Sequence, residues 1–177
     1  MKNTIKLIVI LIFLTNMAVA QDRTRWIEIG EGTYEYGFIY PYKIKLSVPF
    51  GVRSIADIKE GLSPMKFSLT WLPIVYSQDN VKKLFLSQFE KGYSNKESFM
   101  LAENIINFFL KKLPATEKHN KWVFIYYPDE GSKLFINDKK IHHLVGAEFN
   151  RALVHSWLDK SPVLTANLFN RLLKIQK

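Results

Sequence analysis

Apolar and polar residues alternate most regularly between positions 34 and 48. Every even position in this stretch is aromatic or aliphatic, whereas most odd positions are charged, small or polar. A period of two over this length predicts one long β-strand with an aromatic inner face and a wetter outer face. Because Pro41 cannot donate to a β-ladder, we expect this strand to lie at a sheet edge or to bulge there. The even positions are Tyr34, Tyr36, Phe38, Tyr40, Tyr42, Ile44, Leu46 and Val48.

The aromatic row of this strand has two interpretations. Large aromatic side chains usually belong to the hydrophobic core. A row with four tyrosines also suits the wall of a ligand cleft, because each hydroxyl needs a hydrogen-bond partner. The candidate ligand-binding residues are therefore Tyr34, Tyr36, Phe38, Tyr40 and Tyr42.

Further strands are predicted on both sides of this one. Residues 26–29 form a short apolar run, and Gly30 and Gly32 after it indicate a turn. Residues 65–72 alternate again, with Met65, Phe67, Leu69 and Trp71 on one face. Residues 122–127 (WVFIYY) are apolar throughout, so we expect a central strand covered on both sides.

Two turns follow this central strand. Asp129 to Ser132 and Asn137-Asp138 carry turn residues, and the segments 134–136 and 141–144 between and after them are predicted to be strands.

Helical spacing appears in five segments. Ser54, Ser77 and Ser94 are candidate N-caps, and Glu97 has capping-box spacing from Ser94. The helices starting at Ser77 and Ser94 should form an antiparallel pair on the sheet. Trp157 shares one helix face with Phe149 and Leu153, so we expect it to be buried against the strand at 122–127. The predicted helices span 54–62, 77–92, 94–113, 147–158 and 162–173.

The first twenty residues have the pattern of a cleaved export signal. Lys2 and Lys6 precede the apolar run LIVILIFL, and Ala18-Val19-Ala20 supplies small residues at a cleavage site. The apolar run is shorter than the roughly 20 residues of a transmembrane helix. We therefore expect a signal peptide at 1–20, a mature N-terminus at Gln21, one domain over 21–177, and a periplasmic or secreted protein. The alternative for residues 1–20 is an uncleaved N-terminal anchor.

Composition limits the partners of that protein. The chain has no cysteine, so neither a lipid-modified N-terminus nor a disulfide is possible. Its net charge of +9 comes from dispersed lysines. Dispersed lysines indicate solvated faces, with peripheral contact with an anionic membrane surface as the alternative, and nucleic-acid binding is disfavoured for an exported chain.

Motifs of catalysis and cofactor binding are scarce. The chain has no G-x-S-x-G elbow, P-loop or dinucleotide fingerprint. His142 and His143 are adjacent on a predicted strand, so their side chains point to opposite faces and cannot share a metal ion. We expect no catalytic residue, no metal site and no cofactor.

Two segments resemble bacterial chalcone isomerase-like proteins. The first is YKIKLSVP (42–49), and the second runs from Lys121 to Val163. The positions in step with that family's C-terminal pattern are Tyr127, Gly131, Asn137, Phe149, Ala152, Leu153, Trp157, Leu158 and Pro162. The resemblance implies an α+β fold, with a curved antiparallel sheet packed against a layer of α-helices and a ligand cleft between them.

The same resemblance implies either isomerisation of chalcones or binding of fatty acids. Isomerases of the family need an arginine on the early strand, and this chain has none between Arg25 and Arg53. A tyrosine phenol cannot replace the fixed charge of a guanidinium group. We therefore expect a non-catalytic binder of an apolar or amphipathic molecule such as a fatty acid. The alternatives are a periplasmic interaction protein without a ligand cleft and a chalcone isomerase-type lyase.

Overall fold

A six-stranded antiparallel sheet forms the centre of the protein. The computed structural model describes residues 24–93 and 96–159. Across the sheet the strands follow the order β1 (Trp26–Tyr36), β2 (Ile39–Pro49), β3 (Met65–Trp71), β6 (Lys121–Tyr127), β7 (Gly131–Ile136) and β8 (Lys139–Leu144). The short strands β4 (Val75–Tyr76) and β5 (Thr116–Glu117) pair separately.

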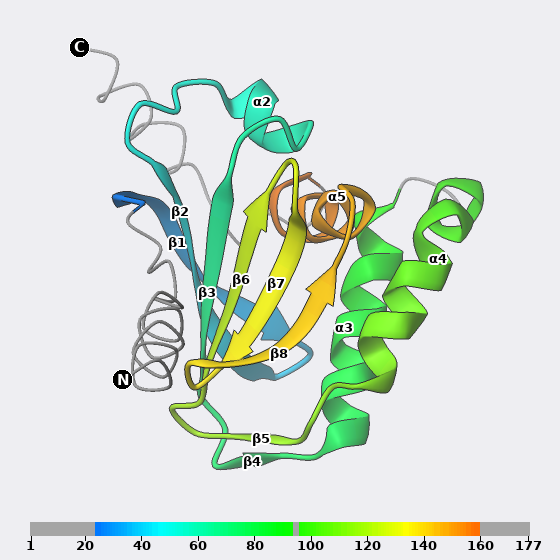
Figure 1. Cartoon of the computed structure of the whole chain (residues 1–177). Coiled ribbons are helices and arrows are strands. Elements are labelled where there is room, and N and C mark those ends of the chain that lie inside the picture. Colours follow the sequence, from blue (N-terminus) through cyan, green and yellow to red (C-terminus); the bar gives the residue numbers. More distant parts are fainter. Residues whose placement is uncertain (1–23, 94–95, 160–177) are drawn as a thin grey trace, which may run out of the picture.

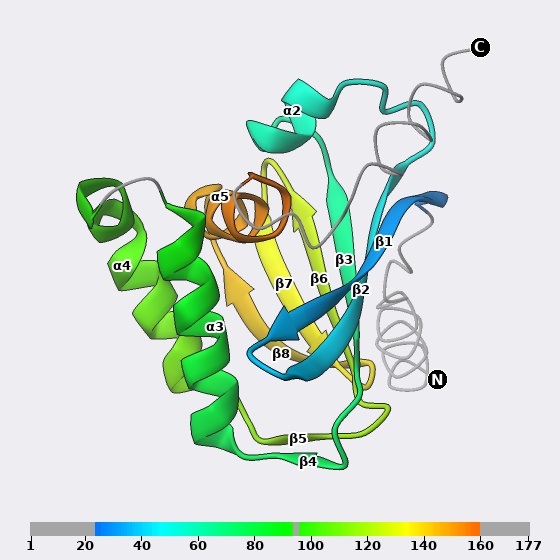
Figure 2. The same ribbon diagram turned by 180° about the vertical axis from the view of Figure 1, so that it is seen from behind.

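The helices lie mainly on one side of this sheet. They are α2 (Ile55–Lys59), α3 (Gln78–Gly92), α4 (Lys96–Lys111) and α5 (Glu148–Val154), and α5 continues into a π-helical turn, η1 (His155–Asp159). Figures 1 and 2 show α3 and α4 side by side, with α5 next to the upper end of α3 and α2 beyond the strand ends. The expected α+β fold is confirmed.

The alternating row at 34–48 is a hairpin, so the expectation of one long strand is wrong. Gly37 and Phe38 form the loop, and Tyr36 lies opposite Ile39. Gly37 has a φ of 62°, which suits the first position of a two-residue hairpin loop. The turn expected at Gly30 and Gly32 is also wrong, because β1 runs through both residues.

A bulge explains why the alternation continues across the hairpin loop. Tyr40 and Pro41 on β2 lie opposite the single Glu35 on β1. Without this extra residue, even positions of β1 would face odd positions of β2. With it, Tyr34 lies opposite Tyr42 and both rings point into the core. The bulge expected at Pro41 is confirmed.

The strands β3 and β6 form the middle of the core. All four residues of the predicted β3 row are buried, and so are Trp122, Phe124 and Tyr126 of β6. The central position of β6 is confirmed. Its other face is only partly covered within the part of the chain that is described, because Val123, Ile125 and Tyr127 are half-buried.

Both turns after β6 form as expected. Asn137 and Asp138 have φ values of 46° and 67°, the pair of positive angles that a type I′ hairpin turn requires. The Asn137 side chain accepts a hydrogen bond from the Lys121 backbone N–H at 2.8 Å. Gly131 begins β7 with a φ of 87°, and a Cβ there would lie 2.2 Å from the Leu144 carbonyl oxygen.

The predicted helix starts at Ser54 and Ser77 are confirmed. Their hydroxyls accept hydrogen bonds from Asp57 N at 3.1 Å and Asn80 N at 3.3 Å, respectively. Ser94 and the helix expected at 162–173 lie outside the described residues, as does the expected signal peptide.

The end of α3 packs directly on the backbone of η1. A Cβ at Gly92 would lie 2.8 Å from the Ser156 nitrogen. Nearby, Trp157 is 1% exposed, and its ring centroid lies 5.8 Å from that of Phe124 on β6. The expected burial of Trp157 against the central strand is confirmed.

Candidate functional site

The five candidate aromatic residues do not share one wall. Tyr34 and Tyr42 are buried and stacked, with ring centroids 5.3 Å apart. Tyr36 is half-buried, and its ring lies 5.8 Å from the Lys91 ammonium. Phe38 and Tyr40 are exposed at the hairpin tip. A role of these five residues in ligand binding stays a prediction.

Tyr42 is the centre of a buried hydrogen-bond cluster. Its hydroxyl accepts a hydrogen bond from Trp157 Nε1 at 3.1 Å and another from Gln88 Nε2. Gln88 Oε1 has no partner among the described residues. Strand β2 therefore contributes the acceptor, and α3 and η1 contribute the donors. These hydrogen bonds connect β2 to both helical elements.

Both buried phenols stay protonated near neutral pH. Burial, reinforced by Tyr36 and opposed by the Gln88 hydrogen bond, raises the pKa of Tyr34 to about 12. Burial also raises the pKa of Tyr42, against the effect of its two hydrogen bonds. Neither hydroxyl can therefore act as a general base at neutral pH.

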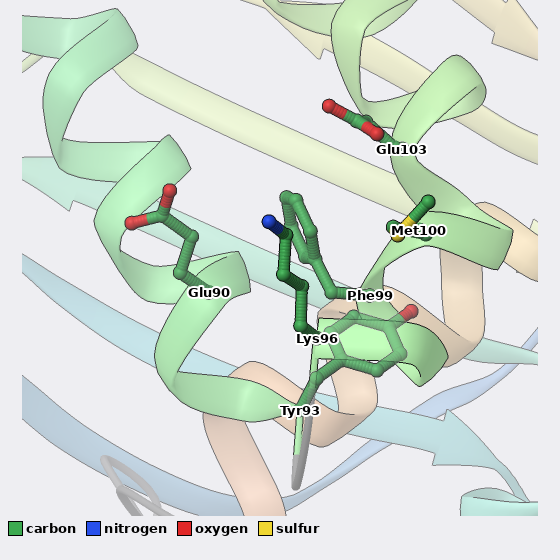
Figure 3. A pocket seen from close by; sticks show the side chains of 6 residues that line it. All are labelled: Glu90, Tyr93, Lys96, Phe99, Met100 and Glu103. Atoms are coloured by element: carbon green, nitrogen blue, oxygen red, sulfur yellow. The ribbon is translucent and has the colours of Figure 1, made fainter.

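An open groove lies where α3 ends and α4 begins. Its volume is about 510 Å³, and Figure 3 shows Lys96 and Phe99 between Glu90 on α3 and Glu103 on α4. Tyr93 packs edge-on against Phe99, with ring centroids 5.9 Å apart. The lining residues are Glu90, Tyr93, Lys96, Phe99, Met100 and Glu103.

A second hollow of about 230 Å³ shares Tyr93 with the first. Its lining residues are Tyr93, Ser98, Leu101, Ala102, Glu148, Arg151 and His155. We call the two hollows together the Tyr93 groove. The Tyr93 and His155 rings are 5.4 Å apart. Burial raises the pKa of Tyr93, and the nearby Arg151 opposes this shift.

The Tyr93 groove combines an apolar wall with two available cations. Tyr93, Phe99, Met100 and Leu101 supply the apolar surface. Within residues 24–93 and 96–159, neither Lys96 nor Arg151 has a carboxylate within ion-pair distance. Glu90, Glu103 and Glu148 line the same groove, so the anionic end of an amphipathic ligand has to lie at Lys96 or Arg151 and away from these carboxylates.

Sequence reasoning missed the residues of both sites. Gln88 had a signal, because it is a polar residue in the apolar stripe of α3. Lys96 and Arg151 had none. Packing of α4 against α3 places Lys96 in the first hollow, and packing of α5 against α4 places Arg151 in the second.

The described residues provide neither a cluster of metal ligands nor a membrane-spanning helix. No group of three or more His, Asp or Glu side chains there could hold a metal ion. His142 is buried and His143 exposed, as expected for opposite faces of β8. No helix in this part of the chain has the length and hydrophobicity needed to cross a membrane.

Comparison with known proteins identifies a structure of similar fold and a matching protein family. A fatty-acid binding protein of Arabidopsis thaliana has a similar structure, with a TM-score of 0.60 and 12% sequence identity over 88% of this chain and 89% of that one. No curated protein matches the sequence. The profile of the family described as chalcone isomerase-like matches residues 36–174. The expected family is therefore confirmed, and the chain belongs to the chalcone isomerase-like family.

Proposed function

We propose that the protein is a non-catalytic binder of an amphipathic anion, such as a fatty acid, in the Tyr93 groove. The observation that carries this proposal is the apolar wall next to Lys96 and Arg151, neither of which forms an ion pair with another described residue. The two hollows, at about 510 and 230 Å³, have sizes near those of small-molecule sites, which span roughly 300–1,000 Å³. The described fatty-acid binding function of the plant protein supports the proposal through the shared fold.

The expected affinity is modest because the groove is open. Six methylene groups against the apolar wall contribute about 5 kcal/mol at ~0.8 kcal/mol each. Lys96 and Arg151 are exposed, so each adds only about 0.2–1 kcal/mol to the binding of a carboxylate. The sum corresponds to a Kd of the order of 10–100 μM.

Binding without catalysis is favoured by the chemistry around the hairpin. The protonated phenols of Tyr34 and Tyr42 provide no base there, and the segment between Arg25 and Arg53 has no arginine to hold a phenolate. We expect no acceleration of chalcone cyclisation over the uncatalysed rate, measured by the loss of chalcone absorbance. Turnover well above that rate would support the isomerase alternative.

Calorimetric titration of residues 21–177 with laurate and dodecanol tests the proposal. We expect both to bind, and Lys96→Gln/Arg151→Gln to weaken laurate about tenfold while leaving dodecanol unchanged. Lys139→Gln/Lys140→Gln removes the same charge from β8 and is the matched control. If neither amphiphile binds, or if both double variants weaken laurate equally, the proposal is wrong.

The filled interior supports one alternative, an interaction protein without a ligand cleft. The space behind the hairpin is occupied by the rings of Tyr34, Tyr42, Trp71 and Phe85. Native mass spectrometry of the protein from its own compartment separates the two functions. A co-purifying lipid supports the binder, and a clean protein mass favours the interaction protein.

The proposal includes export to the periplasm or the medium. It is supported by the charged start, the short apolar run and Ala18-Val19-Ala20. The intact mass of the secreted protein should begin at Gln21, and retention of residues 1–20 would contradict a cleaved signal.

A further inference from the structure

Helix α4 carries apolar side chains on its buried face and also among the polar residues of its outward side. Its inward face is buried in the core through Ala102, Ile106, Phe109 and Leu110. Its outward side carries three exposed apolar side chains: Met100, Leu101 and Phe108 are 57%, 85% and 45% exposed. Leu101 and Phe108 are seven residues apart, so they lie on the same side of the helix. Contacts among the described residues account only for the inward face.

Lysines surround the C-terminal half of this outward side. Lys82 and Lys83 of α3 and Lys111 of α4 line a hollow of about 320 Å³ between the two helices. The other lining residues are Leu86, Asn107 and Leu110, so no carboxylate lies in its wall. Lys112 follows directly, with its ammonium 4.8 Å from the centre of the Phe108 ring.

We propose that this surface, the outward side of α4 with Lys82, Lys83, Lys111 and Lys112, docks on an anionic lipid membrane. Exposed apolar side chains on a helix that also carries lysines are typical of helices that lie in the membrane interface. The lysines attract the negative headgroups, and Leu101 and Phe108 enter the boundary between headgroups and acyl chains. The net charge, +9 for the full chain and +7 without Lys2 and Lys6 of the expected signal peptide, acts in the same direction.

Docking would bring the mouth of the Tyr93 groove to the lipid. Met100 and Leu101 belong both to the docking surface and to the lining of that groove. A fatty acid could then pass between membrane and groove without crossing water. This consequence rests on the proposed function, whereas docking itself does not.

Co-sedimentation with vesicles tests docking. We expect binding to an equal mixture of phosphatidylglycerol and phosphatidylcholine, at least tenfold weaker binding to phosphatidylcholine alone, and loss of binding in high salt. Lys82→Glu/Lys83→Glu should reduce binding at least tenfold. Lys139→Glu/Lys140→Glu, with the same change in charge on β8, should leave most of it.

The apolar contribution needs its own variant. Leu101→Gln/Phe108→Gln changes two exposed side chains, so the fold should persist, which circular dichroism checks, while vesicle binding falls about tenfold. The proposal is overturned if the wild type does not bind anionic vesicles, or if the two lysine double variants lose binding equally. Displacement from vesicles by millimolar inorganic phosphate would also overturn it, because it would indicate a site for small anions.

Docking and ligand binding can fail separately. Lys96→Gln/Arg151→Gln should lose laurate affinity and keep vesicle binding, whereas Lys82→Glu/Lys83→Glu should show the reverse. If only laurate binding is absent in the wild type, the proposed function is wrong and docking stands.

Discussion

Removing one oxygen atom from the core should destabilise the protein substantially. Tyr42→Phe keeps the ring, and with it the stacking on Tyr34, but deletes the acceptor of two buried hydrogen bonds. The Trp157 and Gln88 donors then stay buried without a partner. Each such group costs about 1–3 kcal/mol, which gives a range of about 2–6 kcal/mol.

The lower half of that range is expected for Tyr42→Phe. A phenylalanine ring needs no hydrogen bond, so the folded state no longer carries the desolvation of the hydroxyl. We expect the free energy of unfolding to fall by about 2–4 kcal/mol. For a domain of this size, that change lowers the melting temperature by about 5–15 °C.

Urea and thermal unfolding, followed by tryptophan fluorescence and circular dichroism, measure this effect. Tyr40→Phe is the matched control, since Tyr40 is 55% exposed, and it should change stability by less than about 0.5 kcal/mol. A double-mutant cycle with Gln88→Met measures the coupling between the two side chains. The losses of unfolding free energy in the two single variants should sum to about 0.5–3 kcal/mol more than the loss in the double variant. If Tyr42→Phe behaves like Tyr40→Phe, the hydrogen-bond cluster does not stabilise the fold.

Three further predictions concern Trp157, His142 and Gly131. Trp157→Ala should cost about 3–5 kcal/mol, measured by urea unfolding, because the ring is fully buried; a nearly unchanged melting temperature would contradict this. His142 has a pKa lowered mainly by burial and further by Lys112, so its folded-state pKa lies below its unfolded value. Stability should therefore be full above the unfolded pKa of about 6.5 and fall as the pH drops below it, and His142→Gln should flatten that pH dependence of the melting temperature. Gly131→Ala should destabilise by more than about 1 kcal/mol in thermal unfolding, since its Cβ would meet the Leu144 carbonyl; a smaller change would mean that the turn adapts.

Much of the fold could be predicted because local patterns and tertiary structure agree. The alternation at 65–71 is a strand, the caps Ser54 and Ser77 start helices, and the Asn137-Asp138 turn has the expected geometry. These signals lie within a few residues of one another, so one sequence reveals them. Trp157 was placed correctly because helical spacing alone identifies its face.

The hairpin could not be predicted from its alternation. The two-residue loop at Gly37 and the bulge at Tyr40-Pro41 change the register by amounts that compensate each other. The sequence pattern therefore continues as if the strand did not turn. Gly37 was the one local residue that indicated a turn. Glycine alone is not decisive, because Gly30 and Gly32 lie inside the continuous strand β1.

The Tyr93 groove depends on packing and not on a local pattern. Lys96 and Arg151 are ordinary surface cations in the sequence. Packing of α4 against α3 brings Lys96 near Tyr93, and the approach of α5 to α4 brings Arg151 there. The aromatic row suggested a wall because of its regularity, whereas its members are divided between core and hairpin tip.

The close contact between Gly92 and Ser156 determines which side of the groove can move. Backbone meets backbone there with no side chain between, so the end of α3 and the η1 turn form one rigid unit. Glu90, Tyr93 and His155 are held on that unit. Any widening for a bulkier ligand must therefore come from a tilt of α4. The same helix carries Leu101 and Phe108 on its outward side. A tilt of α4 would therefore change both the range of ligand sizes that the groove accepts and the affinity of the protein for a membrane surface.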